Sequence, residues 1–429
     1  MDPRFIPLAI AVFAWFTFKV IRIGRRDEKL PPGPPTIPIL GNIHLLPPKF
    51  PFFRFTEWAQ EYGGIFSLKV GNGTIIVVSD MAIVKELLDD RSGETSSRPS
   101  LYAVDVVTGR NYLVTATSDD HVWRMGRKAI QPLLAPQAVQ AHLPIAEAET
   151  AQLLHDILHN PEEFYSHIPR STLSFMTSVV FGKPAPRHDS PEATLFREYI
   201  RQLSKIMSPE AAPVDLVPIL NGPYIFGFLE QAEQRIHRGL RNETFIEKIL
   251  DRQEELGLSR EMIPYICGVL LDGGAETSSS FLQSLVLCLV RSPASLRKAQ
   301  EEIDNVVGDE RLPVSSDLEA LPYVQAVIKE THRFRPVGPT GVPHATINDC
   351  RYREYIIPKG APVFINVWGI FHDPNIFERP DEFWPDRYLL SHDGTKPGLS
   401  KNYSIRASLP FGSGKRLCPG IHLANTNLA

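Results

Sequence analysis

The residue with the clearest chemical potential is Cys418, which lies eleven residues before the end of the chain. It stands in the run Phe411-Gly412-Ser413-Gly414-Lys415-Arg416-Leu417-Cys418-Pro419-Gly420. A cysteine thiolate can bind iron as an axial ligand if it stays deprotonated and if the backbone can pass close beneath a flat cofactor. Gly414 and Gly420 lack a Cβ and would give that clearance, and the two cations just before Leu417 would favour the thiolate. An isolated cysteine is more often an inert core residue, so the interpretation depends on these neighbours.

The spacing of this run, Phe-x-x-Gly-x-Arg-x-Cys-x-Gly, resembles the haem-binding loop of the cytochrome P450 family at every fixed position. The resemblance implies that haem b is the cofactor and that Cys418 is the axial ligand of its iron. It also implies that Arg416 pairs with the acidic edge of the haem and that Phe411 shields the sulfur from water. A thiolate ligand pushes electron density onto iron, which favours cleavage of the O–O bond.

A second motif lies at the centre of the apolar, helical stretch Glu261–Val290, in the run Asp272-Gly273-Gly274-Ala275-Glu276-Thr277-Ser278-Ser279-Ser280. Two glycines each cost about 1 kcal/mol relative to alanine in a helix interior, so a local distortion is expected there. The run resembles the oxygen-binding motif of the same family. That resemblance implies that Thr277 hydrogen-bonds dioxygen or an ordered water and that Glu276 relays protons. Standing alone, the motif would fit a Gly/Ser helix–helix contact.

Glu330 and Arg333 are three residues apart on one helical face, a spacing that usually gives a solvated surface ion pair. The segment Pro380–Tyr388 changes this interpretation, because it resembles the family segment Pro-x-x-Phe-x-Pro-x-Arg-Phe, with Tyr388 in place of the final Phe. The resemblance implies a buried charge network of Glu330, Arg333 and Arg387. Its role would be structural, holding the loop that carries the thiolate.

Trp123 and Arg127 are four residues apart, so a helix would direct both side chains to one side. On their own they fit core packing or a surface cation–π contact. In the family a Trp-x-x-x-Arg pair holds a haem propionate. The resemblance therefore implies a charge-assisted hydrogen bond from Arg127 and a weaker one from the indole N–H of Trp123. It also suggests His344 as a further propionate partner.

The elements that must position these residues are mostly helical. Breaks in the helical pattern of residues 136–260 are expected at Pro161, at 183–192 and at 209–223, and another helix should contain Trp123. The expected fold class is mainly α (α+β). By resemblance it is a cytochrome P450 fold with a large helical body and a small β-rich N-terminal subdomain.

Two β-hairpins are predicted. The first joins the β-branched runs Phe66–Val70 and Thr74–Val78 through Gly71-Asn72-Gly73. The second joins Arg351–Ile357 and Ala361–Val367 through Pro358-Lys359-Gly360.

The composition fits a globular enzyme and excludes other classes. With 429 residues, 43% of them hydrophobic, the chain can bury a large core. The formal net charge of −4 and the absence of a Lys/Arg run argue against nucleic-acid binding. Four cysteines without CxxC spacing indicate neither a zinc site nor a disulfide framework, so the folded part is expected to face a reducing compartment.

The N-terminus has a different character. Phe5–Phe18 is uncharged and almost entirely apolar; Lys19, Arg22, Arg25 and Arg26 follow it, and only Arg4 precedes it. This order predicts a retained transmembrane anchor with a lumenal N-terminus and a cytosolic body, because a cleaved signal carries its charge first. A buried core helix is the alternative. The stiff run Leu30-Pro31-Pro32-Gly33-Pro34-Pro35 that follows favours the anchor.

The motifs occur in the family's order from the proline hinge to residue 429. They imply an anchor and basic flank at 1–30 and a catalytic domain at 31–429, in a single-pass protein of the endoplasmic reticulum membrane. The activity implied is a haem-thiolate monooxygenase that inserts one atom of O2 into a lipophilic small molecule, as in fungal microsomal secondary metabolism. Electrons would come from NADPH through NADPH-cytochrome P450 reductase, docking around Lys415, Arg124 and Lys128.

Two departures from the family pattern leave alternatives open. The chain ends soon after Cys418, and the region between Val214 and Glu230 is short, so a C-terminally truncated form is expected. One alternative is therefore a non-enzymatic remnant. The other is a haem isomerase or dehydratase, against which Glu276 and Thr277 argue because that chemistry needs no proton relay. The sequence indicates neither the substrate nor the oligomeric state.

Overall fold

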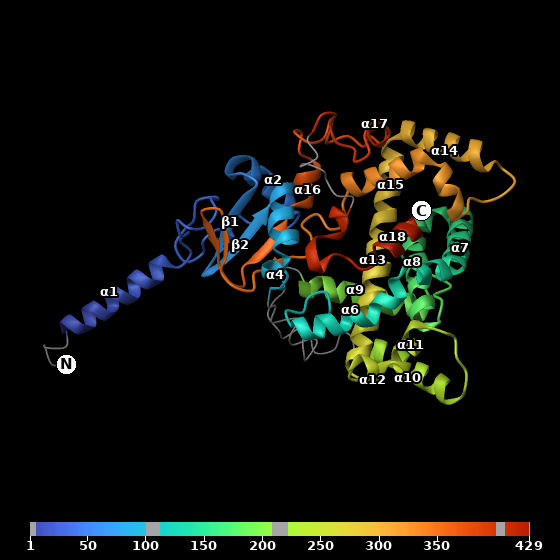
Figure 1. Cartoon of the computed structure of the whole chain (residues 1–429), viewed down its shortest axis with the longest axis horizontal. Coiled ribbons are helices and arrows are strands. Elements are labelled where there is room, and N and C mark those ends of the chain that lie inside the picture. Colours follow the sequence, from blue (N-terminus) through green and yellow to red (C-terminus); the bar gives the residue numbers. More distant parts are fainter. Residues whose placement is uncertain (1–5, 100–111, 208–221, 400–407, 429) are drawn as a thin grey trace. The chain divides into compact units, whose positions relative to one another are not determined.

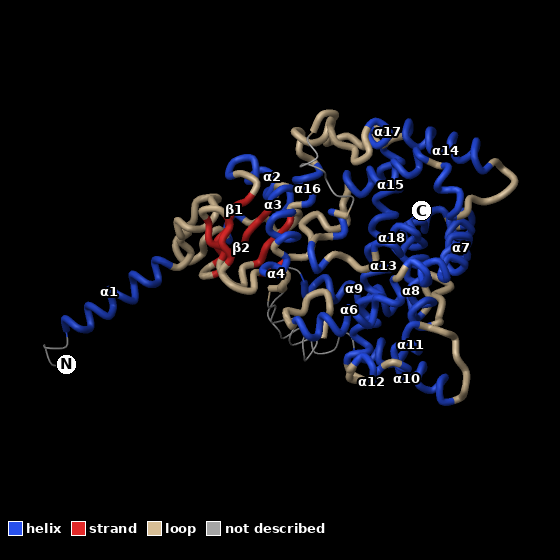
Figure 2. The backbone as a smooth tube through the Cα atoms, viewed as in Figure 1, coloured by secondary structure: helices blue, strands red, loops and turns tan. Residues whose placement is uncertain are grey.

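The computed structural model describes residues 6–99, 112–207, 222–399 and 408–428. The chain forms two compact units. The strand-rich unit comprises Met1–Pro99, Gly338–Asp373 and Ser400–Leu417, and the helical unit comprises Ser100–Val337, Pro374–Leu399 and Cys418–Ala429. The described strands all belong to the first unit, and the longest helix belongs to the second (Figures 1 and 2). A mainly helical fold with a small β-rich part is thus confirmed.

The strand-rich unit is built on a four-stranded sheet of order β1-β2-β6-β3. Its strands are β1 (Ile65–Val70), β2 (Gly73–Val78), β6 (Pro362–Ile365) and β3 (His344–Ala345). β1 and β2 pair antiparallel, with Val70 opposite Gly73, so the first predicted hairpin is confirmed. The helix α2 (Pro51–Tyr62) covers the sheet by packing Phe55 and Trp58 against Phe66 and Leu68. The remaining helices of this unit are α1 (Ile6–Arg22), α3 (Met81–Val84), α4 (Ser92–Thr95) and α16 (Val367–Phe371).

The second predicted hairpin is wrong in its pairing. The strand β4 (Cys350–Tyr352) pairs with β5 (Tyr355–Ile357), and the turn between them places Arg353 at a φ of 51°. β6 instead pairs parallel with β2 and antiparallel with β3. Turn residues with a positive φ are usually glycine or asparagine, so an arginine at this position does not indicate a turn in the sequence. The sequence pattern therefore placed the turn at Pro358-Lys359-Gly360.

The helical unit consists of helices packed around α13 (Met262–Arg291), which runs through it (Figure 1). α13 packs against α6, α8, α10, α15 and α18. The other helices are α6 (Asp120–Leu134), α7 (Pro136–His159), α8 (Phe164–Phe181), α9 (Pro191–Met207), α10 (Gly222–His237), α11 (Phe245–Asp251), α12 (Gln253–Leu256), α14 (Pro293–Val307), α15 (Pro322–Phe334), α17 (Arg387–Leu390) and α18 (Ile421–Leu428).

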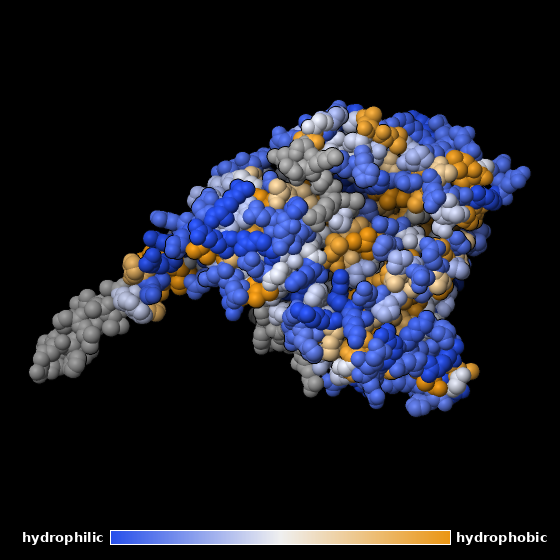
Figure 3. All heavy atoms as spheres, in the orientation of Figure 1, coloured by the Kyte–Doolittle hydropathy of each residue, from blue (hydrophilic) through white to orange (hydrophobic). Residues whose placement is uncertain are grey.

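Hydrophilic and hydrophobic side chains are unevenly distributed on the described surface. On the face shown in Figure 3, hydrophilic side chains cover most of the described surface and smaller hydrophobic patches lie between them. Among the described residues, no helix has both the length and the apolar character needed to cross a membrane. The predicted break at Pro161 is confirmed, and the one at 183–192 is confirmed except at its end, because α8 ends at Phe181 and α9 begins at Pro191. The break at 209–223 lies mostly outside the described residues.

The helical hydrogen bonding of α13 continues without interruption through Gly273 and Gly274, so the expected distortion does not break the helix. The two glycines have different surroundings. A Cβ on Gly274 would lie 2.4 Å from Sδ of Met176 in α8, whereas a Cβ on Gly273 would meet nothing within 4 Å. Gly274 therefore allows α13 and α8 to pack closely, and Gly273 faces open space.

A buried ion-pair network joins α15 to the segment before α17. Arg333 donates to Glu330 through Nε and Nη2, each at 2.8 Å, and Nε of Arg387 lies 3.0 Å from Oε2 of the same carboxylate. The three side chains are 0–2% exposed. Both arginines also donate to backbone carbonyls, Arg333 to those of Pro380 and Glu382, and Arg387 to those of Glu378 and Arg379. The structure thus places the three predicted residues together in the core of one unit.

Replacing the two α13 glycines separately should give opposite results. We expect Gly274→Ala to lower the free energy of unfolding by about 1–3 kcal/mol, because its Cβ would overlap Met176. Gly273→Ala is the matched control and should raise it by up to about 1 kcal/mol through helix propensity. Denaturant unfolding of both variants measures the difference, and equal changes would contradict the packing role of Gly274.

Neutralising the centre of the buried network should be strongly destabilising. We expect Glu330→Gln to lower the free energy of unfolding by about 3–5 kcal/mol, because two buried guanidinium groups lose their counter-charge. Glu255→Gln is the matched control, since Glu255 forms a bidentate pair with Arg252 at the same spacing on the surface. That change should cost under about 0.5 kcal/mol. Similar losses in the two variants would show that burial does not set the strength of the network.

Candidate active site

Cys418 lies in the helical unit, immediately before the turn that leads into α18. Its side chain is exposed, yet enough protein surrounds the sulfur that desolvation raises the pKa of the thiol. Two groups act in the opposite direction on this pKa: the backbone N–H of Gly420, which is directed at the sulfur, and the guanidinium of Arg127. A Cβ on Gly420 would lie 3.7 Å from Sγ, so the glycine leaves space beside the sulfur.

Arg127 and Trp123 lie on one face of α6, as their spacing predicts. The helix begins after Asp119, whose carboxylate accepts the N–H groups of His121 and Val122. Cζ of Arg127 lies 6.0 Å from the centre of the Trp123 ring. Burial lowers the pKa of Arg127 and the nearby Cys418 raises it, so the cation and the sulfur sense each other's charge. This arrangement places one guanidinium close to the predicted iron ligand.

The α13 residues present hydroxyl and carboxyl groups on one face. Thr277 is exposed, and its Oγ1 donates to the carbonyl of Gly273 at 2.6 Å. Burial raises the pKa of Glu276. Burial, with a smaller contribution from Glu276, also raises the pKa of Asp272 to about 6. One helical turn therefore carries two carboxyl groups that bind protons more tightly than carboxyl groups in water, and the sequence interpretation had given Asp272 no role.

The other predicted residues of the Cys418 loop belong to the strand-rich unit. Gly414 has a φ of +61° and its Cβ would lie 2.0 Å from the carbonyl oxygen of Leu88, so only glycine fits. Its N–H and the hydroxyl of Ser413 both donate to Oδ1 of Asp89, at 2.8 and 2.7 Å. Gly414 is therefore required by this contact with the π-helical turn Lys85–Asp90, which is a reason other than clearance for a cofactor. Phe411 is half-buried.

Arg416 lies beside a second arginine that the sequence analysis missed. Nε of Arg416 donates to the carbonyl of Ser96 at 2.8 Å, and Nη1 of Arg98 donates to the carbonyls of Val342 and Pro343, each at 2.8 Å. Burial, together with repulsion from Arg416, lowers the pKa of Arg98 to about 9. A buried and a half-buried guanidinium group that repel each other favour a nearby anion.

His344 is also part of this cationic group but is itself neutral. It is 3% exposed, and burial followed by repulsion from Arg98 lowers its pKa to about 3. Its Nδ1 lies 3.1 Å from the carbonyl of Thr95, so Nδ1 carries the proton and Nε2 is an acceptor. A neutral His344 with this hydrogen bond has no second donor for a carboxylate. Arg98 is therefore a further candidate partner of an acidic group beside His344, whose pKa a neighbouring carboxylate would raise.

Each unit, taken by itself, carries residues of kinds that a haem requires. Cys418 provides a sulfur with a backbone N–H and a cation beside it, and Gly420 leaves space next to that sulfur. Arg98 and Arg416 provide guanidinium groups of the kind that bind carboxylate groups such as haem propionates. In the helical unit, Arg127 provides another guanidinium group that could bind a carboxylate.

Comparison with known proteins agrees with this fit. The family model for cytochrome P450 matches residues 31–429. A cytochrome P450 monooxygenase of the fungus Armillaria gallica is 39% identical over 96% of this chain and 82% of its own length. Another, from Rhodocybe pseudopiperita, is 36% identical over 99% of this chain and 84% of its own length. The solved structure of a zebrafish cytochrome P450 has the same fold, with a TM-score of 0.74 at 23% identity over 89% of each chain. With its relatives and its cysteine loop in agreement, this chain belongs to the cytochrome P450 family and is a haem-dependent monooxygenase.

Proposed function

We propose that this protein is a haem-thiolate monooxygenase that inserts one atom of O2 into a lipophilic small molecule in fungal secondary metabolism. The observation that carries the proposal is the setting of Cys418, whose sulfur is approached by the Gly420 N–H and by Arg127. Both groups stabilise the thiolate form that iron binds. The fungal monooxygenases to which the chain is similar support the same assignment.

The chain's own residues would divide the work around the haem. When bound, the haem would supply the binding and reductive activation of dioxygen. Cys418 would hold the iron, while Arg127, Arg98 and Arg416 would bind the acidic edge of the macrocycle.

The exposed hydroxyl of Thr277 can turn from the Gly273 carbonyl to a group outside the helix. Glu276, with its raised pKa, can hold a proton at its carboxyl group and pass it on. These two residues would therefore supply protons on the side of α13 that carries them.

The substrate is proposed to be lipophilic because a closed apolar pocket keeps water from the reactive oxidant. Its walls would come from residues 99–120, residues near 195–225, the helix before Thr277 and Val337–Val342. Most of the first of these segments and part of the second lie outside the described residues. The printed names of the relatives state monooxygenase activity and leave the substrate open.

Electron delivery and location are further parts of the proposal. NADPH-cytochrome P450 reductase would dock through basic residues. Arg124 and Lys128 are exposed one turn apart on α6 of the helical unit, and Lys415 is exposed in the strand-rich unit. The N-terminal segment would hold the protein at the endoplasmic reticulum membrane. Phe13, Trp15, Phe16 and Phe18 support this, because α1 exposes each of them by more than half.

The role of Cys418 can be tested by spectroscopy. We expect Cys418→Ser to abolish the thiolate-type Soret band of the reduced, carbon monoxide-bound protein, because a hydroxyl does not replace the anionic sulfur. Cys350→Ser is the control, since Cys350 is a buried cysteine that accepts a hydrogen bond from Arg91, and it should leave the band intact. A normal band in Cys418→Ser would refute the assignment of the iron ligand.

The role of Thr277 separates oxygenation from isomerase or dehydratase chemistry. We expect Thr277→Ala to lower the rate of oxygenated product formation by about a hundredfold with the Soret band unchanged, because a positioned hydroxyl donor is lost. Ser280→Ala, one turn further along α13, should keep the rate within about threefold. Product formation that needs no reductase and is the same in Thr277→Ala would contradict monooxygenation.

A further inference from the structure

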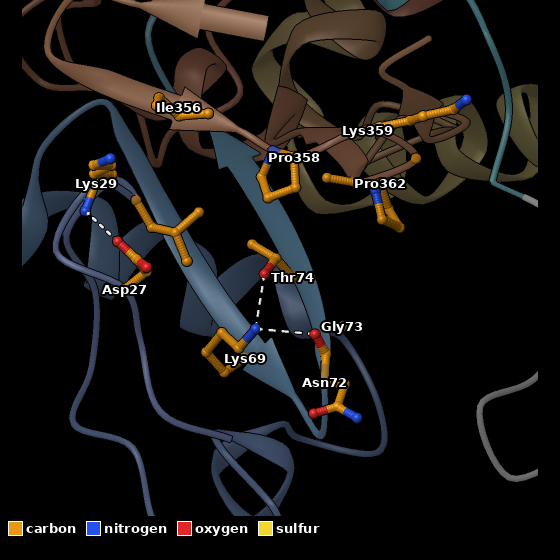
Figure 4. A pocket seen from close by; sticks show the side chains of 13 residues that line it. Asp27, Lys29, Lys69, Asn72, Gly73, Thr74, Ile356, Pro358, Lys359 and Pro362 are labelled. Carbon is orange, nitrogen blue, oxygen red and sulfur yellow. Dashed lines mark hydrogen bonds between the residues drawn. The ribbon is translucent and has the colours of Figure 1, made fainter. Parts of the chain in front are cut away.

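The strand-rich unit has a hollow lined by charged side chains, but these do not converge on one point. The hollow measures about 430 Å³ and lies between the turn of the β1–β2 hairpin and the segment that leads into β6 (Figure 4). Nζ of Lys69 donates to Oγ1 of Thr74 and to the carbonyl of Asn72, whereas Lys359 points away from it. Side chains that do come together outside the haem site are found in the helical unit.

Two histidines lie one turn apart at the end of α7 in that unit (Figure 1). His155 and His159 are four residues apart, so both side chains leave the same face of the helix. Their ring centres are 4.0 Å apart, and the two ring planes differ by 24°. Both residues are exposed, so solvent and small ions can reach them. The helix therefore holds two imidazole rings side by side at the surface.

The hydrogen bonds of the pair leave the Nε2 atom of each ring available. Nδ1 of His159 lies 2.8 Å from the carbonyl oxygen of His155, so Nδ1 carries the proton and Nε2 of the neutral ring keeps its lone pair. Nδ1 of His155 lies 3.8 Å from Oδ1 of Asp156, which favours a proton on that nitrogen too. Histidines that bind metal ions usually direct their second ring N–H at a carbonyl or a carboxylate in this way.

Asp156 is held by other groups, so it orients His155 rather than acting as a ligand itself. Its Oδ1 accepts from Nε2 of Gln152 at 2.7 Å, and its Oδ2 lies 3.3 Å from Nη2 of Arg170. Within the described ranges, no group of three or more histidine, cysteine, aspartate or glutamate side chains could hold a metal ion. A metal ion at this pair would therefore have two protein ligands, and water would complete its coordination.

The place of the pair in the helix also favours a cation. α7 ends at His159, and the N–H of the next residue, Asn160, binds the carbonyl of Asp156. The last carbonyl groups of a helix give its C-terminus a partial negative charge. A dication bound by these two histidines would lie at this end of the helix.

We propose that His155 and His159 chelate one divalent transition-metal ion through their Nε2 atoms. Imidazole nitrogen suits Cu2+, Ni2+ and Zn2+, whereas Mg2+ and Ca2+ require oxygen ligands. For one set of nitrogen ligands, Cu2+ binds more tightly than either Ni2+ or Zn2+, so Cu2+ is the preferred ion. The site connects successive turns of α7 and has no part in the haem chemistry described above.

Calorimetric titration of the full, haem-loaded chain tests the proposal. The chain carries no affinity tag, the buffer does not bind metal ions, and the three probes are CuCl2, ZnCl2 and MgCl2. We expect one tight site for Cu2+, binding of Zn2+ that is at least about tenfold weaker, and no binding of Mg2+. Binding of Mg2+ as tight as that of Cu2+ would indicate oxygen ligands and would overturn the assignment.

Variants then locate the tight site. His155→Gln and His159→Gln should each bind Cu2+ at least about tenfold more weakly, because the remaining imidazole cannot chelate. His121→Gln is the matched control, since His121 is exposed on α6 of the same unit and has no histidine three or four residues away. It should bind Cu2+ as the unchanged protein does. An unchanged affinity in His155→Gln or in His159→Gln would overturn the site.

The electron paramagnetic resonance spectrum of bound Cu2+ identifies the ligands directly. After subtraction of the spectrum of the metal-free protein, we expect coupling to two imidazole nitrogens in the unchanged chain and to one or none in each of the two variants. Far-ultraviolet circular dichroism of all the variants should match that of the unchanged protein, because the replaced side chains are exposed. A Cu2+ spectrum without coupling to two nitrogens would refute the chelate.

Discussion

The chemistry of this protein depends on keeping one sulfur anionic in surroundings that oppose its charge. Desolvation raises the pKa of Cys418, and within the part of the chain that the structure describes the Gly420 N–H and the Arg127 guanidinium lower it. Iron binds the thiolate rather than the thiol, so these two groups provide part of what the metal needs. Arg127 is in turn held by α6, whose first turn is capped by Asp119. The capped helix α6, through Arg127, and the N–H of Gly420 thus both lower the pKa of the Cys418 thiol.

In the strand-rich unit the charges that lie close together are positive. Arg98 and Arg416 are placed close enough to repel each other, and backbone carbonyls accept hydrogen bonds from both guanidinium groups. Such hydrogen bonds orient a guanidinium group. His344 stays neutral in this field and binds the Thr95 carbonyl. The unit thus places two guanidinium groups near each other, and groups of this kind suit the carboxylates of a haem.

The sequence predicted those features whose signals are local or carried by a complete motif. Gly71-Asn72-Gly73 fixed the first hairpin because a tight turn needs residues of that kind, and the spacing of Trp123 and Arg127 placed both on one face of α6. The second hairpin was paired wrongly because Arg353 adopts a positive φ without any sequence signal. Arg98 was missed because its partners are the carbonyls of residues 342 and 343, and any residue type can supply a backbone carbonyl. Asp272 gained its raised pKa from burial, which depends on the packing of α13.

The Glu330 network shows why a costly arrangement can still specify a fold. Glu330 accepts from Arg333 and from the N–H of Trp384 and forms an ion pair with Arg387, so one carboxylate joins a helix to two stretches of a later segment. Replacing such a group by apolar residues is often neutral for stability, so the network is not explained by stability alone. Its geometry, however, satisfies both arginines only when the carbonyls of residues 378, 379, 380 and 382 occupy fixed positions. Any other path of this irregular segment would leave a buried guanidinium without acceptors, which costs far more than a loss of packing. The charges therefore select one conformation for a stretch of chain that has little secondary structure of its own.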